Sequence, residues 1–338
     1  MKRLPLHRFH QQLGATFGQF AGFEMPLYYR KPLEEHRTVR QTGGVFDVSH
    51  MAQLAAEGGG AADFFRFALA NDAGGMGDGE ALYSPICRED GGVLDDLIVY
   101  RRSASVWRIV VNAANRAADL EWLSQLARPF GVAIGEVAGG YCLFAVQGPQ
   151  VFSRLKGRVT PPPDSLGYFR CCDGEAFGVP VLIARTGYTG EPGCELAVAE
   201  SGAARVWEGL TGSLAIPPIG LAARDSLRLE ACMALYGHEL RAEWHPFESG
   251  LGWAVKLERA GDFMGKEALA RVRRGGSSHL QAALRMIGRG VPRAGYPVLL
   301  EGRQVGEVTS GTFAPTTGAA VALAHLEAAA ARRGTALA

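Results

Sequence analysis

The segment from residue 91 to residue 100 constrains the fold most, because it places Asp95 and Asp96 side by side in a stretch otherwise typical of a turn followed by a buried strand. Moving an ionised carboxylate from water into an apolar strand costs several kcal/mol unless the group is paired or hydrogen-bonded. Neighbouring side chains on a strand point to opposite faces. We therefore expect one aspartate to face a pocket while the other caps the turn or meets solvent.

The composition is that of a soluble globular protein. The chain has 338 residues, which allows two or three domains with sizeable cores. Its 47% hydrophobic and 20% charged residues argue against general disorder. The formal net charge of +1 lacks the basic excess of proteins that coat nucleic acids, and residues 271–274 form the only dense basic cluster. We expect no nucleic-acid partner.

The cysteines and the apolar segments indicate a reduced, cytoplasmic protein. Six cysteines are scattered without any C-x-x-C pair, so zinc-ribbon and thioredoxin-like sites are not supported. The N-terminus has no continuous apolar region, and no stretch is long and apolar enough to span a bilayer. We expect a cytoplasmic location and no membrane association.

Hydrophobic periodicity predicts a mixed α+β first part and a small β-rich last part. The first part contains expected strands at 106–111, 141–146 and 179–184, and expected helices at 114–127, 203–210 and 221–231. After a Gly-rich linker near residue 275, short strands are expected at 279–287, 298–300, 305–309 and 319–325. The predicted division is a region 1–272 followed by a small β-barrel or sandwich over 278–338. The ending at residue 338 stops where a further strand is expected.

Common catalytic signatures are absent. The chain has no P-loop, no H-E-x-x-H, no G-x-S-x-G and no dinucleotide-binding fingerprint. A phosphate-bearing cofactor is therefore not indicated. The polar residues that remain stand at the ends of apolar strands.

The segment 185–195 combines an aromatic ring with a carboxylate. Tyr188 lies on a glycine-containing turn, and Glu195 follows at the start of the next strand. A tyrosine face can stack on a flat heterocycle for about 0.5–1.5 kcal/mol, and a carboxylate can accept two N–H donors from an amino-pyrimidinone edge. A hairpin with a surface tyrosine and glutamate is an equally open interpretation.

Two further residues carry possible roles. Arg224, near the start of an expected helix, could clamp a ligand edge with its planar guanidinium, although a structural role is also open. His50 stands in the dense cluster from Phe46 to Met51, where a hydrogen-bonded structural histidine is favoured because no metal-ligating set is nearby.

The ordered blocks of this chain resemble the aminomethyltransferase (T-protein) family of the glycine cleavage system, also known as the folate-binding GcvT family. The blocks cover almost the whole chain: residues 20–26, 46–51, 71–72, 91–100, 111–115, 147–149, 185–195, 220–230, 235–238, 250–253 and 309–312. So many blocks in the same order are far more specific than any one of them.

The resemblance implies a fold and a reaction. The implied fold is a three-domain ring, with two intertwined mixed α/β folate-binding domains and a C-terminal β-barrel domain. The implied reaction passes a one-carbon unit from the aminomethyl-lipoyl arm of the H-protein to tetrahydrofolate, giving 5,10-methylenetetrahydrofolate, ammonia and the dihydrolipoyl carrier. Tetrahydrofolate is the one-carbon acceptor, and no metal, flavin or nicotinamide is called for.

The resemblance also implies roles for single residues. Asp96 matches the key carboxylate beside the reacting folate nitrogens, where it would orient the pterin and accept or relay a proton as N5 attacks the methylene carbon. Glu195 and Arg224 match contacts to the pterin edge. The other residues expected to line the pocket are Met51, Tyr83, Tyr100, Asn112 and Tyr188.

The chain departs from the family pattern in three places. The usual Asn-Pro before Phe-Glu is His245-Pro246, the familiar Glu-Asp-Gly is Glu191-Pro192-Gly193, and a phenylalanine before the carboxylate is Cys194. The expected C-terminal barrel is shortened, because a final strand pair and tail of the family pattern are not visible.

Two alternatives remain open. A related folate-dependent demethylase could use the same acceptor with a free small molecule as donor. A non-enzymatic folate-binding protein of iron–sulfur cluster maintenance is the other, although its Lys-Gly-Cys-Tyr motif is missing and Cys232 stands in Glu-Ala-Cys-Met.

Overall fold

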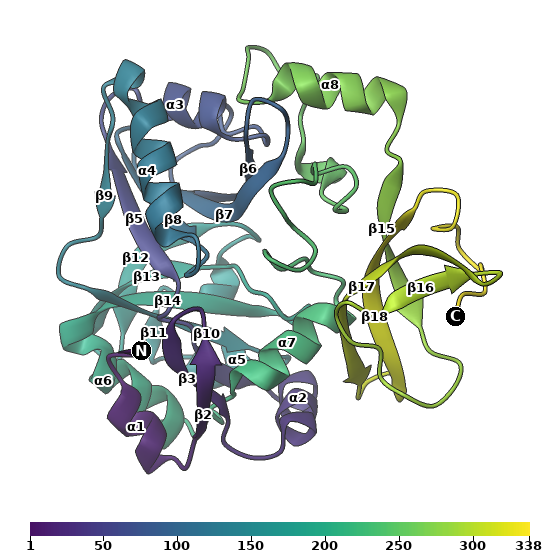
Figure 1. Ribbon diagram of the computed structural model, residues 1–338. Helices are drawn as coiled ribbons and strands as arrows, with labels where there is room; N and C mark the ends of the chain where they lie inside the picture. Colours follow the sequence, from purple (N-terminus) through teal and green to yellow (C-terminus); the bar gives the residue numbers. More distant parts are fainter.

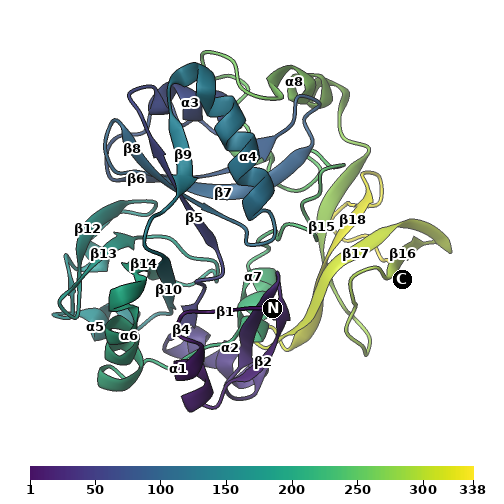
Figure 2. The same cartoon turned by 60° about the vertical axis from the view of Figure 1, so that its left-hand side comes forward.

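The computed structural model describes residues 1–338 as three parts arranged around a common centre. Two parts, each an antiparallel sheet packed with helices, lie on one side, and a four-stranded sheet formed by the end of the chain lies on the other (Figure 1). A second view keeps the three parts distinct (Figure 2). The predicted α+β class with a separate, β-rich C-terminal part is confirmed. The exact limits 1–272 and 278–338 stay a prediction.

The first part is a five-stranded antiparallel sheet of order β6-β7-β8-β5-β9. Its strands are β5 (Ala52–Glu57), β6 (Glu80–Cys87), β7 (Val93–Arg101), β8 (Val106–Val111) and β9 (Ala133–Glu136). Helices α3 (Ala61–Ala68) and α4 (Arg116–Ala127) cover one face, where Phe64, Phe65 and Leu123 pack on Leu54 and Ile109. Burying these side chains contributes roughly 1.5–3 kcal/mol each.

The second part is a six-stranded sheet of order β11-β12-β13-β14-β10-β4. Its strands are β4 (Gly44–Asp47), β10 (Tyr141–Gln147), β11 (Val159–Thr160), β12 (Cys171–Ala176), β13 (Val179–Ala184) and β14 (Gly193–Ala199). Helices α5 (Val151–Leu155) and α6 (Glu200–Glu208) pack on one face through Val151, Val206 and Trp207. Strand β4 comes before the five-stranded sheet in sequence, and β10 comes after it. The second part is therefore built from two segments of the chain that are separated by the first part.

The uncovered faces of these two sheets share a hydrophobic core. Tyr100 and Val110 come from the five-stranded sheet, and Leu143 and Ala197 come from the six-stranded sheet. Helices α2 (Pro32–Gln41) and α7 (Leu221–Glu230) close this core with Val39, Ala223 and Leu227. Polar residues at the rim of this shared core are therefore held by rigid elements on two sides.

The N-terminal segment adds small elements beside α7. A sheet of order β1-β3-β2 contains β1 (Lys2–Arg3), β2 (Thr16–Phe20) and β3 (Phe23–Tyr28), and helix α1 (His7–Gln12) lies between β1 and β2 in sequence. Pro32 begins α2, where its fixed φ and missing N–H suit the first helical turn.

The C-terminal part is an antiparallel sheet of order β15-β18-β17-β16 that follows helix α8 (Lys266–Gly275). Its strands are β15 (His279–Arg285), β16 (Pro297–Leu300), β17 (Arg303–Ala314) and β18 (Ala319–Glu327). No pairing joins the edge strands β15 and β16, so the expected barrel is not closed. The backbone of Ala338 instead pairs with that of Leu299 on β16, at N···O distances of 2.9 and 2.6 Å.

The expected elements are present with shifted ends. Strands β8 and β13 have the predicted limits, whereas the strand expected at 305–309 extends over Arg303–Ala314 because it pairs with both β16 and β18. The helix expected at 203–210 begins earlier, at Glu200, and after Glu208 it widens into a π-helical turn over Gly209–Ser213. None of the helices has the length and apolarity needed to cross a membrane.

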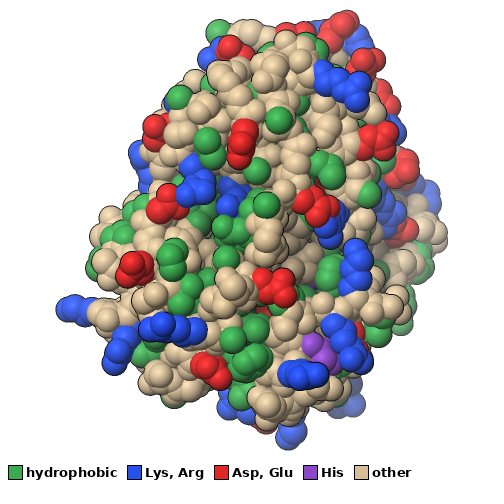
Figure 3. Space-filling view, turned by 90° about the vertical axis from the view of Figure 1, so that its left-hand side faces the viewer, with side chains coloured by type: hydrophobic (Ala, Val, Ile, Leu, Met, Phe, Trp, Pro, Cys, Tyr) green, Lys and Arg blue, Asp and Glu red, His purple; other side chains and the backbone are tan.

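Charged side chains are mixed over the face that carries β9 and α6. Lys and Arg alternate with Asp and Glu among neutral side chains, and no patch of one sign covers that face (Figure 3). This distribution matches the formal net charge of +1.

A buried polar network joins α7 to the C-terminal sheet. Arg228 of α7 donates to Glu239 Oε2 at 2.8 Å and to Ser310 Oγ of β17 at 2.7 Å. Thr309 Oγ1 donates to Glu239 Oε1 at 2.6 Å. Arg228 and Glu239 are each only 1% exposed, so the ion pair is shielded from water. We call these four residues the interdomain network.

We expect Arg228→Met to lower the free energy of unfolding by about 3–5 kcal/mol, because it leaves Glu239 as a buried charge without its partner. Urea unfolding followed by tryptophan fluorescence measures the change. The double variant Arg228→Met/Glu239→Gln should be less destabilised than the single variant. Arg241→Met removes the half-exposed pair with Glu307 and serves as a control, at about 1 kcal/mol or less. An unchanged urea midpoint for Arg228→Met would contradict the expectation.

Candidate functional site

Strand β7 places its two aspartates on opposite faces of the five-stranded sheet. Leu97 and Val99 belong to the core beneath the helices, and Tyr100 belongs to the core shared with the second sheet. By the same alternation Asp95 faces α4 and Asp96 faces the shared side. Asp95 is completely buried, so the expectation that it caps a turn or meets solvent is wrong.

Asn112, just after β8, holds both carboxylates. Its Nδ2 lies 2.7 Å from Asp95 Oδ1 and 2.8 Å from Asp96 Oδ1. Its backbone N–H donates to Asp95 Oδ2 at 3.3 Å. The two hydrogens of one amide are thus divided between adjacent carboxylates, which fixes the position of both.

Asp96 has a strongly perturbed environment. Burial, followed by the negative charge of Asp95, raises the pKa of the Asp96 carboxyl to about 7. Tyr83 donates its hydroxyl to Asp96 Oδ2 at 2.9 Å, and this hydrogen bond acts in the opposite direction. A carboxyl group with a pKa near 7 can both accept and return a proton at neutral pH.

Arg224 and Tyr188 form a second group at the site. The guanidinium of Arg224 lies over the Tyr188 ring, 4.8 Å from its centre. Its Nη1 is buried without a hydrogen-bond partner, and burial lowers the pKa of Arg224. The Tyr188 hydroxyl donates to the carbonyl oxygen of Ala234, which fixes the ring. A buried guanidinium nitrogen without an acceptor is costly, and a ligand oxygen would satisfy it.

Glu195 and Tyr100 form a third group. Thr186 Oγ1 donates to Glu195 Oε2 at 2.5 Å. The Tyr100 hydroxyl lies against the same two groups; burial and the charge of Glu195 raise its pKa. Tyr100 and Glu195 line a small cavity together with Val110 and Leu143. Met51 packs against the same core cluster, and its place in a ligand pocket stays a prediction.

The three groups influence one another electrostatically. Burial is the main cause that raises the pKa of Tyr188, and the charge of Asp96 adds to it. The charge of Glu195 opposes the lowering of the Arg224 pKa. The structure therefore brings together the residues that the sequence proposed, although their contacts with a ligand stay a prediction.

Two residues of this region were missed by the sequence analysis. Trp253, in the turn Gly252–Ala254, stacks on Tyr83 with ring centres 5.7 Å apart at 17°, and 58% of its surface is exposed. Asp119 of α4 lies against Asp95 and is only 2% exposed. A single tryptophan after Gly-Leu-Gly could have suggested a site wall, whereas Asp119 gave no signal beyond a common acidic residue in a first helical turn.

His50 is not the hydrogen-bonded residue that the sequence suggested. It is buried against the rings of Phe20 and Phe23, and its Nδ1 has no hydrogen-bond partner. Burial and then the charge of Arg224 lower the pKa of His50 to about 3. The imidazole is therefore neutral at physiological pH and adds no second cation beside Arg224.

Known proteins resemble the chain over almost its full length. The family model described as the GCVT N-terminal domain matches residues 6–259, and that of the glycine cleavage T-protein C-terminal barrel domain matches residues 281–338. The aminomethyltransferase of Streptomyces avermitilis is 45% identical over 341 residues, covering 99% of this chain and 92% of the relative. That of Thermotoga neapolitana is 44% identical over 327 residues, covering 96% and 89%.

A solved structure agrees with the fold. The crystal structure of glycine cleavage system aminomethyltransferase T from Bartonella henselae superposes with a TM-score of 0.94 at 36% identity, covering 99% of this chain and 92% of that one. Fold and similarity together define an enzyme of the transferase class. The chain belongs to the glycine cleavage T-protein family.

We expect Tyr83→Phe to raise the pKa of Asp96 above its value of about 7, because the carboxylate loses a hydrogen-bond donor. A rise of about one unit is the size expected for a hydrogen bond to a charged group. Carboxyl carbon NMR of aspartate-labelled protein measures it. Tyr168→Phe, at an exposed tyrosine outside the site, is the matched control. A lower or unchanged pKa in Tyr83→Phe would refute the assignment of this donor.

Proposed function

We propose that this protein is the aminomethyltransferase of a glycine cleavage system and uses tetrahydrofolate as the one-carbon acceptor. In this reaction the carbon of an aminomethyl group carried on the lipoyl arm of the H-protein passes to tetrahydrofolate. The products are 5,10-methylenetetrahydrofolate, ammonia and the dihydrolipoyl carrier. Family membership and the names of the relatives support this proposal.

The observation that carries the proposal is the arrangement around Asp96. A half-buried carboxyl with a pKa near 7 faces the same region as an unpaired guanidinium and a fixed aromatic ring. An acid–base group beside a flat, polar binding surface suits a reaction at the nitrogens of a reduced pterin.

The acceptor would be held by complementary polar contacts. Glu195 can accept N–H donors from the amino-pyrimidinone edge, and the free Nη1 of Arg224 can donate to an oxygen of the same ligand. Tyr188 cannot rotate away while its hydroxyl is bound to Ala234, so its position is set before a ligand arrives. We also propose Met51, Tyr83, Tyr100 and Asn112 as residues that line this pocket.

Asp96 would then accept and return a proton during the transfer. The methylene carbon loses its bonds to the donor sulfur and nitrogen and gains bonds to N5 and N10 of the acceptor. N5 and N10 each lose one proton, while the sulfur and the departing amine each gain one. As a base, Asp96 accepts a proton as N5 attacks, and as an acid it returns that proton to a departing group. Such help typically contributes 10²–10⁴-fold to a rate.

The pKa of Asp96 predicts how turnover depends on pH. The base must be ionised, so turnover should rise as the pH passes upward through about 7. Asp96→Asn should lower turnover by about 10²–10⁴-fold while tetrahydrofolate still binds. The measurement is formation of methylenetetrahydrofolate and ammonia from aminomethyl-loaded H-protein.

Asp63→Asn provides the matched control, because its carboxylate is exposed on α3 and paired only with Arg66. It should retain full turnover. If Asp96→Asn turned over normally, the proposed role of Asp96 would be rejected.

Arg224→Ala should weaken tetrahydrofolate binding, because one hydrogen bond to a charged group contributes about 1.5–3 kcal/mol. Isothermal titration calorimetry measures the affinity. Arg274→Ala, at an exposed arginine near the end of α8, should bind as the unmodified protein does. An unchanged affinity of Arg224→Ala would remove this residue from the proposed site.

A further inference from the structure

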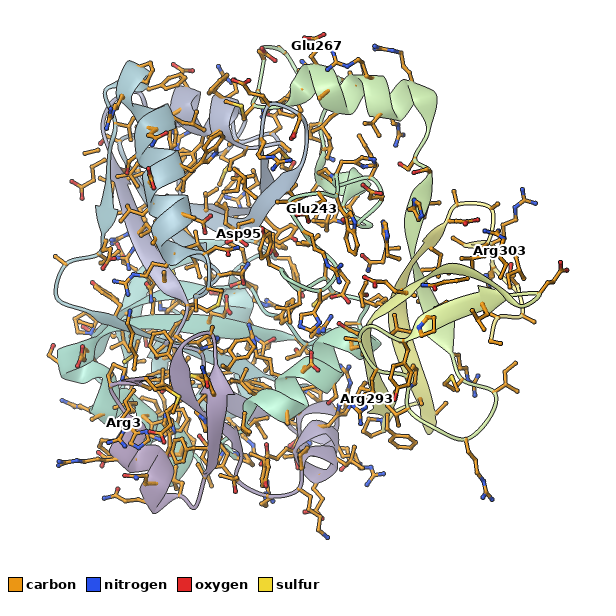
Figure 4. All side chains as sticks on the ribbon, viewed as in Figure 1. Arg3, Asp95, Glu243, Glu267, Arg293 and Arg303 are labelled. Carbon is orange, nitrogen blue, oxygen red and sulfur yellow. The ribbon has the colours of Figure 1, made fainter.

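Three carboxyl groups lie together at the junction of β7 and α4. Asp95 is 0% exposed and Asp119 is 2% exposed, and Asp96 shares the Asn112 amide with Asp95. Asp95 lies near the centre of the molecule, beside the first turn of α4 (Figure 4). The titratable groups that face the cluster from other elements are Tyr83 of β6 and Tyr188 and Tyr236 from the loops. None of them is a cation.

One buried carboxyl oxygen of this cluster, Oδ2 of Asp119, has no hydrogen-bond partner. The N–H groups that donate to Asp95 are the backbone and side-chain N–H groups of Asn112, and the side chain of Asn115 also lies within hydrogen-bonding reach of Asp95. Asp119 also lies within hydrogen-bonding reach of Asp95, yet its buried Oδ2 has no partner among the amide and hydroxyl donors of the protein. Two ionised carboxylates offer only acceptors, so their contact is favourable only when one of them carries a proton.

Asp119 is the group that holds this proton. Burial, followed by the hydrogen bond to Asp95 and its charge, raises the pKa of the Asp119 carboxyl to about 10. Burial also raises the pKa of Asp95, and the hydrogen bond from Asp119 acts in the opposite direction without cancelling the rise. At neutral pH the stable arrangement is therefore a carboxylic acid at Asp119 that donates to a carboxylate at Asp95.

We propose that Asp119 is a positioning residue for the reaction at Asp96: its carboxylic acid donates a hydrogen bond that keeps Asp95 ionised and in place beside Asn112. This inference rests on the proposed function only in taking Asp96 as the reacting base. Asp119 has its hydrogen-bond contact with Asp95, so it acts on Asp96 through Asp95 and the shared amide of Asn112.

The connection has two consequences for Asp96. Asp95, when fixed in position, holds the Asn112 amide, and the amide in turn fixes the orientation of the Asp96 carboxylate. The charge of Asp95 also raises the pKa of Asp96. Because the proton on Asp119 keeps Asp95 charged, it also influences the pKa of Asp96. Removing the donor should make Asp95 take up a proton itself, which would remove its charge and lower the pKa of Asp96.

Two variants at position 119 separate this role from simple packing. Asp119→Asn keeps an N–H donor toward Asp95 and is neutral, like the protonated acid. It should keep turnover within about twofold and leave the midpoint of the pH profile in place. Asp119→Leu has no donor; it should lower kcat by about 10- to 100-fold, the scale of a misplaced catalytic group, with little change in the KM for tetrahydrofolate. The midpoint of its pH profile should move to lower pH.

Glu121→Ala is the matched control, because Glu121 is exposed on the same helix and interacts with Gln125. It should leave both kcat and the pH profile unchanged. A merely structural Asp119 would lower the melting temperature of Asp119→Leu without moving the pH midpoint. That result, or a loss of activity in Asp119→Asn equal to that in Asp119→Leu, would overturn the proposal.

Infrared spectroscopy tests the proton without any turnover. At pH 8.5, where Asp96 is largely ionised, the unmodified protein should show the carbonyl stretch of a protonated carboxylic acid, and Asp119→Asn should lose that band. Absence of the band would overturn the inference whatever the kinetics show, and would do so even if the Asp119→Leu variant failed to fold. Failure of the proposed function would appear instead as normal turnover in Asp96→Asn, so the two failures are distinguishable.

Discussion

The site depends on the amide of Asn112, whose nitrogen lies 2.7 Å from one carboxylate and 2.8 Å from its neighbour in sequence. Two adjacent carboxylates in a buried strand repel each other and lose their hydration, and both effects destabilise the folded state. The structure resolves this conflict by giving each aspartate a separate face of β7 and one hydrogen of a common amide. The cost that remains appears as a raised pKa at Asp96. A carboxyl group with a pKa of about 7 suits the proton transfer proposed for Asp96.

The electrostatics of the site also depend on what surrounds Arg224. A guanidinium usually secures several acceptors when it is buried. Here it has an aromatic face below it, a neutral imidazole beside it and a carboxylate nearby, but no acceptor for Nη1. The lowered pKa of His50 follows from burial and then from the charge of Arg224, and it leaves Arg224 as the cation of this pair.

The sequence predicted the regular elements better than it predicted the polar contacts. Strands such as β8 and β13 follow from continuous apolar runs, because such runs are buried whichever sheet they join. The role of Asp95 could not be predicted, since Asp119 becomes its partner only when α4 packs on the sheet. His50 was misjudged for a similar reason: its neighbours Phe20 and Phe23 come from a distant hairpin. Local patterns also left open whether the C-terminal strands form a barrel or a sandwich, because pairing at the edges of that sheet is decided by geometry that they do not encode.

The hydroxyl of Tyr188 ends on the carbonyl oxygen of Ala234, within the segment that the interdomain network fastens to the C-terminal sheet through Glu239. The Tyr188 ring is therefore held both by its own turn and by a segment that is bonded to the C-terminal sheet. Motions of the C-terminal sheet relative to the rest of the molecule would therefore tilt the Tyr188 ring. Substitutions in that distant sheet should alter how firmly the Tyr188 ring is held in the orientation proposed for contact with a ligand.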